Sequence, residues 1–378
     1  MKKILNIKIA FLAVASLFFL ASCEKEVMKK GPGEELPGEP ITFGATIEES
    51  EAVTKGSPIT GNTLGSYQYF GVYTYHLPSP DGGTTPGSTA NAIGQYMADN
   101  LQVYWNGSSF YYNSAVNWWP SAENNCLMFY AYYPRSASGV SVSVPQGVAV
   151  NPQMQITYEM DANPSSHVDL MYAGTSAIYR TVVPVNFRHA LTRISFSAKL
   201  ANPTRDNGIV KVSRLQLKNV RNKGTLTVAN GNPGTWVLSA GEYDKRNFDL
   251  SIDNGRLKSG DSGSNDAVLK EDSFISIMSS SAGDLMVIPQ TVNDMILEID
   301  LAVKKTVMVE GQPILTDVSE KNFLALPEAY PWVQGKHLDY QLYIARDVIY
   351  LGVYMTVWKT EDSSGNPYTG GDINLEVQ

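Results

Sequence analysis

The chain has 378 residues and a formal net charge of −8, and only 17% of its residues are charged. Its lysines and arginines are scattered rather than clustered, which argues against a nucleic-acid-binding face. Tyrosine, tryptophan, phenylalanine, valine, threonine, glycine, asparagine and serine are abundant, and long charged helical segments are missing, so we predict an all-β protein with many turns.

The N-terminal segment has the features of a secretory signal. Lys2 and Lys3 give it a positive start, and residues 9–20 form an apolar run that is too short for a comfortable membrane span. The run ends in Leu20-Ala21-Ser22-Cys23. This ending resembles the lipobox of bacterial lipoproteins, in which the cysteine is diacylated and becomes the mature N-terminus. We therefore predict a signal peptide at residues 1–22 and lipidation of Cys23; the alternative is an ordinary signal peptide with a chance cysteine.

A tether and a first strand are expected next. Residues 24–40 are charged, rich in proline and glycine, and nearly devoid of bulky apolar side chains. Such a segment cannot bury enough surface to fold, so residues 23–40 are predicted to be a flexible tether. Residues 41–47 then alternate with a period of two, which predicts a half-buried strand. The side chains expected on its apolar side are Ile41, Phe43, Ala45 and Ile47.

Further strands are expected at intervals punctuated by turns, and Asn106-Gly107 is a strong hairpin signal. No sustained period of 3.6 residues occurs outside the signal peptide. The length after the signal exceeds that of most single domains, so we expect two β-sandwiches in tandem, at residues 41–190 and 191–378, with the boundary within 185–205. The expected strands after the first are 69–75, 101–105, 109–113, 127–133, 153–158, 182–187, 193–199, 210–217, 224–228, 235–238, 285–288, 295–303, 338–344 and 350–358.

The end of the chain carries another alternating segment. Ile373, Leu375 and Val377 alternate with polar residues up to the last position, after a glycine-rich stretch at 363–371. The pattern predicts a terminal strand. It is either mobile or an edge strand of its own domain, and the sequence leaves both possibilities open.

The sequence offers no catalytic constellation. Gly260-Asp261-Ser262-Gly263 matches the tetrapeptide around the nucleophile of trypsin-like proteases, but it lies in a polar loop of turn formers and Ser264 follows it instead of glycine. Cys126 lies in an aromatic run and is expected to be a packed thiol. We predict that the protein is not an enzyme and has no catalytic residues, metal or other cofactor. The four histidines lie far apart, without ligand spacing: His76, His167, His189 and His337.

A dense group of aromatic residues has two interpretations. Aromatic platforms bind sugars, but aromatic cross-strand pairs also fill the cores of β-sandwiches. We favour core packing. The residues are Tyr104, Trp105, Tyr111, Tyr112, Trp118 and Trp119.

Several segments together resemble one family, the fimbrillin-like (FimA/Mfa-type) lipoproteins of Bacteroidales, which are subunits of type V pili. The resemblance spreads in order over nearly the whole mature chain. The matching segments are the lipobox ending in Cys23, then 41–43, 70–73, 118–120, 127–134, 185–194, 285–290 and 332–340.

The resemblance implies a fold and a mode of assembly. Members of this family have two transthyretin-like β-sandwich domains and reach the outer membrane as lipoproteins. In polymerising members, a trypsin-like protease cuts after a basic residue downstream of the first strand. That strand leaves a hydrophobic groove, and a C-terminal strand of the neighbouring subunit fills it, which is β-strand addition between chains.

The sequence supplies candidates for each part. The first strand, with Ile41, would be the removable strand, Lys55-Gly56 the cleavage site, and the segment from Ile373 to Val377 the donor. Family members commonly have arginine where Lys55 stands, and an arginine-specific protease would not cut there. Lys55 is nevertheless the only lysine or arginine between Lys30 and Arg135. The alternative is that Lys55 is an ordinary surface lysine.

These observations favour a surface-exposed outer-membrane lipoprotein that serves as a pilus subunit, in the stalk or as an accessory or tip protein, with a role in adhesion. Its expected partners are other pilus subunits, the membrane through the N-terminal lipid before processing, and a host or bacterial surface ligand, but not nucleic acid. The alternatives are a pilus anchor that retains its lipid, and a surface lipoprotein that never polymerises and binds a glycan or host ligand.

Overall fold

The computed structural model describes residues 39–47, 69–81, 85–94, 96–106, 108–112, 116–120, 124–200, 210–229, 233–241, 244–250, 274–278, 283–345 and 348–357. The chain divides into two compact units, 1–37 and 38–378, and all described residues lie in the second. The described part is all-β, with 22 strands and two short 3-10 turns, η1 (Thr89–Asn91) and η2 (Pro164–Ser166). This confirms the fold class expected from composition and periodicity.

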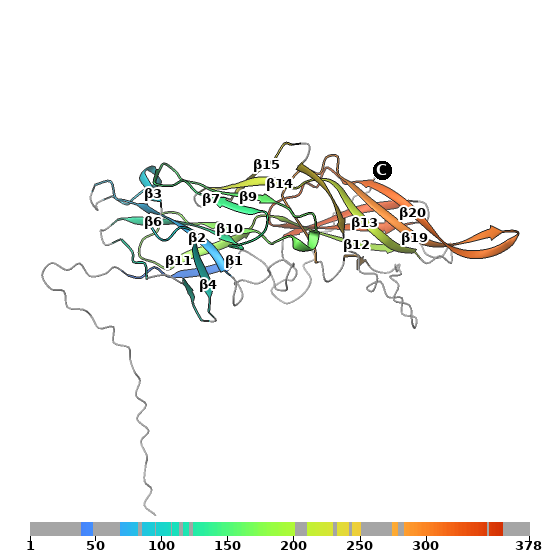
Figure 1. The fold of residues 1–378 in the computed structure, drawn as a ribbon, viewed down its shortest axis with the longest axis horizontal. Coiled ribbons are helices and arrows are strands. Elements are labelled where there is room, and N and C mark those ends of the chain that lie inside the picture. The colour runs from blue at the N-terminus through green and yellow to red at the C-terminus, as the bar shows by residue number, and fades with distance from the viewer. Residues whose placement is uncertain are drawn as a thin grey trace, which may run out of the picture. The chain divides into compact units, whose positions relative to one another are not determined.

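The largest sheet has nine strands (Figure 1). Its main path runs β1-β11-β10-β6-β2-β3-β8, and β4 and β5 continue from β2 as a hairpin. The bounds are β1 (Phe43–Ile47), β2 (Tyr69–Leu77), β3 (Ala92–Gly94), β4 (Leu101–Trp105), β5 (Phe110–Tyr112), β6 (Cys126–Tyr133), β8 (Val148–Ala149), β10 (Met171–Gly174) and β11 (Val183–His189).

Three smaller sheets complete the fold. One has the order β17-β12-β21-β22, with β18 also paired to β12; another has the order β16-β13-β19-β20; the third has the order β15-β14-β9-β7. The bounds are β7 (Val140–Ser143), β9 (Met154–Glu159), β12 (Thr192–Leu200), β13 (Val210–Arg221), β14 (Lys223–Val228), β15 (Thr235–Leu238), β16 (Lys245–Leu250), β17 (Ile275–Ser276), β18 (Leu285–Val287), β19 (Ile296–Val309), β20 (Gln312–Ala325), β21 (Lys336–Ile344) and β22 (Ile349–Val357).

The side chains of strand β6 are buried on both faces of the large sheet. Alternate side chains of a strand point to opposite faces. Met128 and Tyr130 belong to the larger hydrophobic cluster of the protein, whereas Leu127 and Phe129 belong to a second, smaller cluster. The nearly continuous apolar sequence of β6 therefore follows from burial on both sides.

One sheet takes strands from both sides of the expected domain boundary at residues 190 and 191. β14 pairs antiparallel with β9 from Lys223↔Glu159 to Val228↔Met154. The larger hydrophobic cluster likewise includes Tyr130 and Tyr340. A hydrogen-bonded ladder thus joins the two halves of the chain, in addition to the peptide between β11 and β12, while the division into two domains stays a prediction.

Strand β20 was not among the expected strands. It forms a hairpin with β19 in which all 14 residues of each strand are paired, from Ile296↔Ala325 to Val309↔Gln312. The turn is Glu310-Gly311, and both residues have positive φ, 51° and 78°. Two consecutive left-handed residues match the twist of a two-residue hairpin, and glycine at the second position adopts this conformation without strain.

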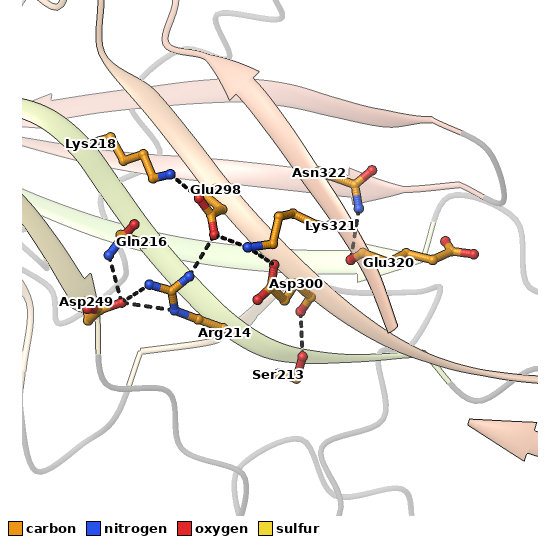
Figure 2. Close-up of polar contacts among 10 residues, drawn as sticks. All are labelled: Ser213, Arg214, Gln216, Lys218, Asp249, Glu298, Asp300, Glu320, Lys321 and Asn322. Atoms are coloured by element: carbon orange, nitrogen blue, oxygen red, sulfur yellow. Dashed lines mark hydrogen bonds and ion pairs between the residues drawn. The ribbon is translucent and has the colours of Figure 1, made fainter. Parts of the chain in front are cut away.

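A network of ion pairs joins β13, β19 and β20 in the sheet that contains this hairpin (Figure 2). The Glu298 side chain on β19 is 3% exposed, although it is a carboxylate. Arg214 Nη1 and Lys321 Nζ each lie 2.7 Å from its Oε1, and Lys218 Nζ pairs with its Oε2. Three cations on β13 and β20 therefore offset the cost of removing this carboxylate from water.

The pKa of Glu298 follows from these contacts. Hydrogen bonds from Lys218 and then Lys321 lower the pKa of Glu298 to about 2, against an ordinary value of 4.5. A depressed carboxylate pKa contributes stability above the ordinary value, and this stability is lost as the pH falls toward the lowered value.

We predict that Glu298→Gln destabilises the protein at neutral pH, because Arg214, Lys218 and Lys321 lose the buried carboxylate that all three share. The remaining carboxylates compensate only in part: Asp249 still pairs with Arg214, and Asp300 Oδ1 lies 3.9 Å from Lys321 Nζ. The free energy of unfolding, measured by urea titration, should differ most from wild type above about pH 4.5, and the difference should shrink toward about pH 2. Glu328→Gln, at an exposed position, is the matched control and should show no such pH dependence. A difference that stays constant from pH 7 to pH 2 would contradict this account.

Candidate functional site

The candidate site is the first strand, β1, and the apolar surface beneath it. β1 is at the edge of the nine-stranded sheet and pairs in parallel with β11, from Phe43↔Val183 to Ile47↔Phe187 (Figure 1). Among the described strands, β11 is its only ladder partner. β1 is therefore held by one row of backbone hydrogen bonds and by the burial of its side chains.

The alternation expected for residues 41–47 is present in the structure. The four apolar side chains are almost fully buried, with exposures of 1% for Ile41, 5% for Phe43 and Ala45, and 4% for Ile47. The intervening Thr42 and Thr46 are exposed. Because one face of the strand is apolar and the other polar, its register on β11 is strongly specified.

Phe43 is the central contact of the strand. Its ring meets those of Phe70, Phe129 and Tyr112 edge-on, at centroid distances of 6.4, 5.8 and 6.0 Å. Edge-to-face arrangements of this kind add to the free energy of apolar burial. The surface that β1 covers forms the smaller hydrophobic cluster with it, including Phe70, Val72, Leu101, Val103, Trp119, Leu127, Phe129, Ala131, Met171, Ala173, Val183, Val185 and Phe187.

Polar contacts fix the segment that precedes β1. The Ile41 N–H donates to the Asn117 carbonyl at 2.9 Å, and the Trp119 N–H donates to the Glu39 carbonyl at 2.9 Å. The Tyr112 hydroxyl donates to the carbonyl of Ile41 at 3.2 Å. Glu39 lies near the end of the expected tether, and its carbonyl is already hydrogen-bonded to Trp119. The sequence did not indicate these hydrogen-bond partners.

The other predicted site residues lie outside the described residues. They are Cys23, Lys55, Gly56, Ile373, Leu375 and Val377. Lipidation, cleavage and strand donation therefore stay predictions. The structure brings together only the four apolar side chains of the removable strand.

The aromatic group divides between core and surface. Trp119 is 2% exposed and packs against Phe129, and Tyr112 packs against Phe43, as core packing predicts. Trp118 is 41% exposed and Tyr111 37%. The two interpretations of this group therefore apply to different members.

One arrangement of serine, histidine and aspartate was not found from the sequence. Ser195 Oγ on β12 lies 2.8 Å from His337 Nε2 and 2.8 Å from Asp339 Oδ1, both on β21. Burial, with a further effect of nearby Arg193, holds the pKa of His337 well below its ordinary value. In a hydrolase triad the histidine lies between serine and acid. Here the serine lies between them and donates to Asp339 Oδ1, so the arrangement differs from that of a hydrolase triad.

Four further features that could indicate function are a cysteine, a metal site, the protease-like tetrapeptide and a membrane-spanning helix. Burial raises the pKa of the Cys126 thiol, which disfavours the reactive thiolate. Within the described ranges, no group of three or more His, Cys, Asp or Glu side chains is placed to hold a metal ion. The Gly260–Gly263 tetrapeptide lies outside the described residues. In the part of the chain that is described, no helix is long and apolar enough to cross a membrane.

We predict that Phe43→Ala destabilises the uncut protein by about 3–5 kcal/mol, because it leaves a cavity among aromatic rings that have little freedom to collapse. Chemical unfolding at equilibrium measures the change. Thr42→Ala alters an exposed position of the same segment, and its effect should be within about 0.5 kcal/mol. Equal effects of the two substitutions would show that the apolar face of β1 does not hold the strand.

Comparisons with known proteins found one family model and several solved structures. A family model described as fimbrillin-like matches residues 60–358. A fimbrial protein from Bacteroides vulgatus has a TM-score of 0.59 at 18% identity, with 84% of this chain and 99% of that chain covered. A candidate cell adhesion protein from Bacteroides ovatus has a TM-score of 0.48 at 15% identity, covering 86% of this chain and 99% of that one. No curated protein matches the chain significantly.

Proposed function

The chain belongs to the fimbrillin-like family, and from this premise we propose that it is a structural subunit of a cell-surface pilus, with a role in adhesion. We further propose that it is exported as an outer-membrane lipoprotein acylated at Cys23. Cleavage after Lys55 then releases β1, and the subunits join by exchange of a donor strand.

The observation that carries the proposal is the way β1 is attached. It is an edge strand that places alternate apolar side chains on an apolar surface, and it pairs with β11 alone among the described strands. Its loss would expose Phe70, Phe129 and Phe187, each at most 1% exposed in the uncut chain. A bare apolar groove of this kind strongly favours a replacement strand.

The C-terminal segment has a suitable pattern for the replacement. Ile373, Leu375 and Val377 recur with the same period of two as the buried residues of β1. Each large apolar side chain that enters the groove would contribute about 1.5–3 kcal/mol before the cost of ordering the segment. Backbone pairing with β11 would fix the register of the incoming strand.

The position of Lys55 suits a triggering cleavage. It lies in the sequence between β1, which ends at Ile47, and β2, which begins at Tyr69. A cut after Lys55 breaks the covalent link between β1 and the rest of the fold, so that the strand is then held only by non-covalent contacts. Dissociation thereby becomes possible without unfolding of the other strands.

We predict that replacing Ile373, Leu375 and Val377 together by aspartate abolishes polymer formation in a Bacteroidales host, because a charged strand cannot enter an apolar groove. Polymer is measured by electron microscopy and by gel migration without heating. The control adds charge to the other side of the same segment with Asn374→Asp and Gln378→Asp, and it should still assemble. Polymers of normal length from the triple variant would refute the donor assignment.

The cleavage site gives a separate prediction. Lys55→Gln should leave β1 attached to the mature subunit and prevent polymerisation, since a trypsin-like protease requires a basic residue before the cut. Lys55→Arg should be processed and should assemble. Intact mass and polymer content are measured on the same surface fraction. Normal polymerisation of Lys55→Gln would place the trigger elsewhere.

A further inference from the structure

Three tyrosines form a row across adjacent strands of the nine-stranded sheet. Tyr69 on β2 lies opposite Tyr104 on β4, and Tyr104 lies opposite Tyr111 on β5. The ring centroids of Tyr69 and Tyr104 are 5.4 Å apart, and the rings of Tyr104 and Tyr111 are also in contact. Neighbouring strands are about 4.8 Å apart, so the row extends over about 10 Å.

The row is partly open to solvent, and none of its three tyrosines belongs to either hydrophobic core cluster. Tyr69 is 40% exposed and Tyr111 37%. The next residues along these strands, Phe70, Val103 and Tyr112, point to the other face of the sheet, where they pack in the cluster that contains β1. The sheet therefore buries one set of aromatic and aliphatic side chains and presents a second, aromatic set to water.

Planar polar side chains border the tyrosine row. Gln102 is two residues before Tyr104 on β4 and therefore lies on the same face. Arg135 Nη1 donates to Gln102 Oε1 at 3.3 Å, and the Arg135 N–H donates to the Tyr69 carbonyl at 3.3 Å. Gln102 is half-buried, and its amide nitrogen can donate to a ligand while its Oε1 accepts from Arg135.

Hydrogen bonds to Asn100, in the turn just before β4, hold the Arg135 guanidinium in place. Its Nε and Nη2 donate to the Asn100 carbonyl at 3.2 and 3.1 Å. Asn100 Oδ1 in turn accepts from the Tyr132 hydroxyl at 2.9 Å. The polar border is therefore preorganised, which lowers the entropy cost of binding a ligand.

We propose that Tyr69, Tyr104 and Tyr111, with Gln102 and Arg135 at their border, bind a short carbohydrate chain. The C–H faces of sugar rings pack on aromatic rings, and sugar hydroxyls accept and donate hydrogen bonds at amide, guanidinium and phenol groups. An apolar peptide is a poorer fit, because every side chain of the site carries a polar group. A polyanion is a poorer fit because the chain has a net charge of −8.

The site is separate from the surface that β1 covers, because the two use opposite faces of β2, β4 and β5. Carbohydrate binding therefore goes beyond the proposed assembly function and does not depend on it. A subunit binds through the tyrosine row whether or not β1 has been released.

The test titrates the full mature chain with cellohexaose, maltohexaose and N-acetylchitohexaose by isothermal calorimetry, with saturation-transfer NMR on the tyrosine ring protons. At least one probe should bind saturably. Tyr69→Ala with Tyr111→Ala should weaken that binding by about tenfold or more, because two stacking surfaces are lost. Tyr69→Phe with Tyr111→Phe retains the rings and should keep most of the affinity.

Two controls separate binding from folding. Tyr350→Ala removes a tyrosine that is 50% exposed on a different sheet, and it should leave binding unchanged. The thermal unfolding midpoint of each variant shows whether it has folded. If the double alanine variant fails to fold, Gln102→Ala is tested in its place. Gln102 is partly exposed, and the substitution removes an amide that donates to the ligand, so it should weaken binding. The proposal is overturned if none of the three probes binds, or if binding survives in the folded alanine variant.

Discussion

The central strands of the nine-stranded sheet, β2 and β6, are apolar on both faces, and this is the constraint on which the rest of the account depends. The face that carries Tyr130 and Met128 is covered by the larger cluster, which draws on strands along most of the chain. The face that carries Phe129 and Leu127 is covered in part by β1. Without β1, part of this apolar face would be open to water, which is unfavourable, so a segment of chain has to cover it. The requirement is for alternating apolar side chains on an extended backbone, and it does not specify one particular segment.

A strand can cover this apolar face without being covalently linked to the rest of the domain. β1 has one ladder partner among the described strands, and its contact face is formed by apolar side chains, so fewer backbone hydrogen bonds hold it than hold an interior strand. By contrast, β14 pairs with β9, and its Leu226 lies in the larger cluster together with residues from both halves of the chain. In the proposed pilus, the subunit would keep these interior ladders intact while it exchanges one edge strand. Buried Glu298 and its three cations add a further fixed element on the sheet of β13 and β19.

The sequence predicted what local periodicity encodes. Residues 41–47 alternate clearly, and all four of their apolar side chains are buried. The apolar run at 127–133 likewise predicted a strand, now β6, and the structure shows that both of its faces are buried. β20 was missed because Pro313 near its start and the charged residues Asp317, Glu320 and Lys321 obscure its alternation. The parallel pairing of β1 with β11 joins positions such as Phe43 and Val183, and no local pattern carries that information.

The mature N-terminus of the surface protein tests the central claim most directly, because β1 either remains in the subunit or does not. Intact mass and terminal sequencing of chains collected from the cell surface measure it. Our account predicts a start at Gly56, with residues 1–55 absent from assembled subunits. A population that consists entirely of chains beginning at an acylated Cys23 would contradict it, because β1 would then be a permanent part of the fold and the protein a fixed membrane-anchored component.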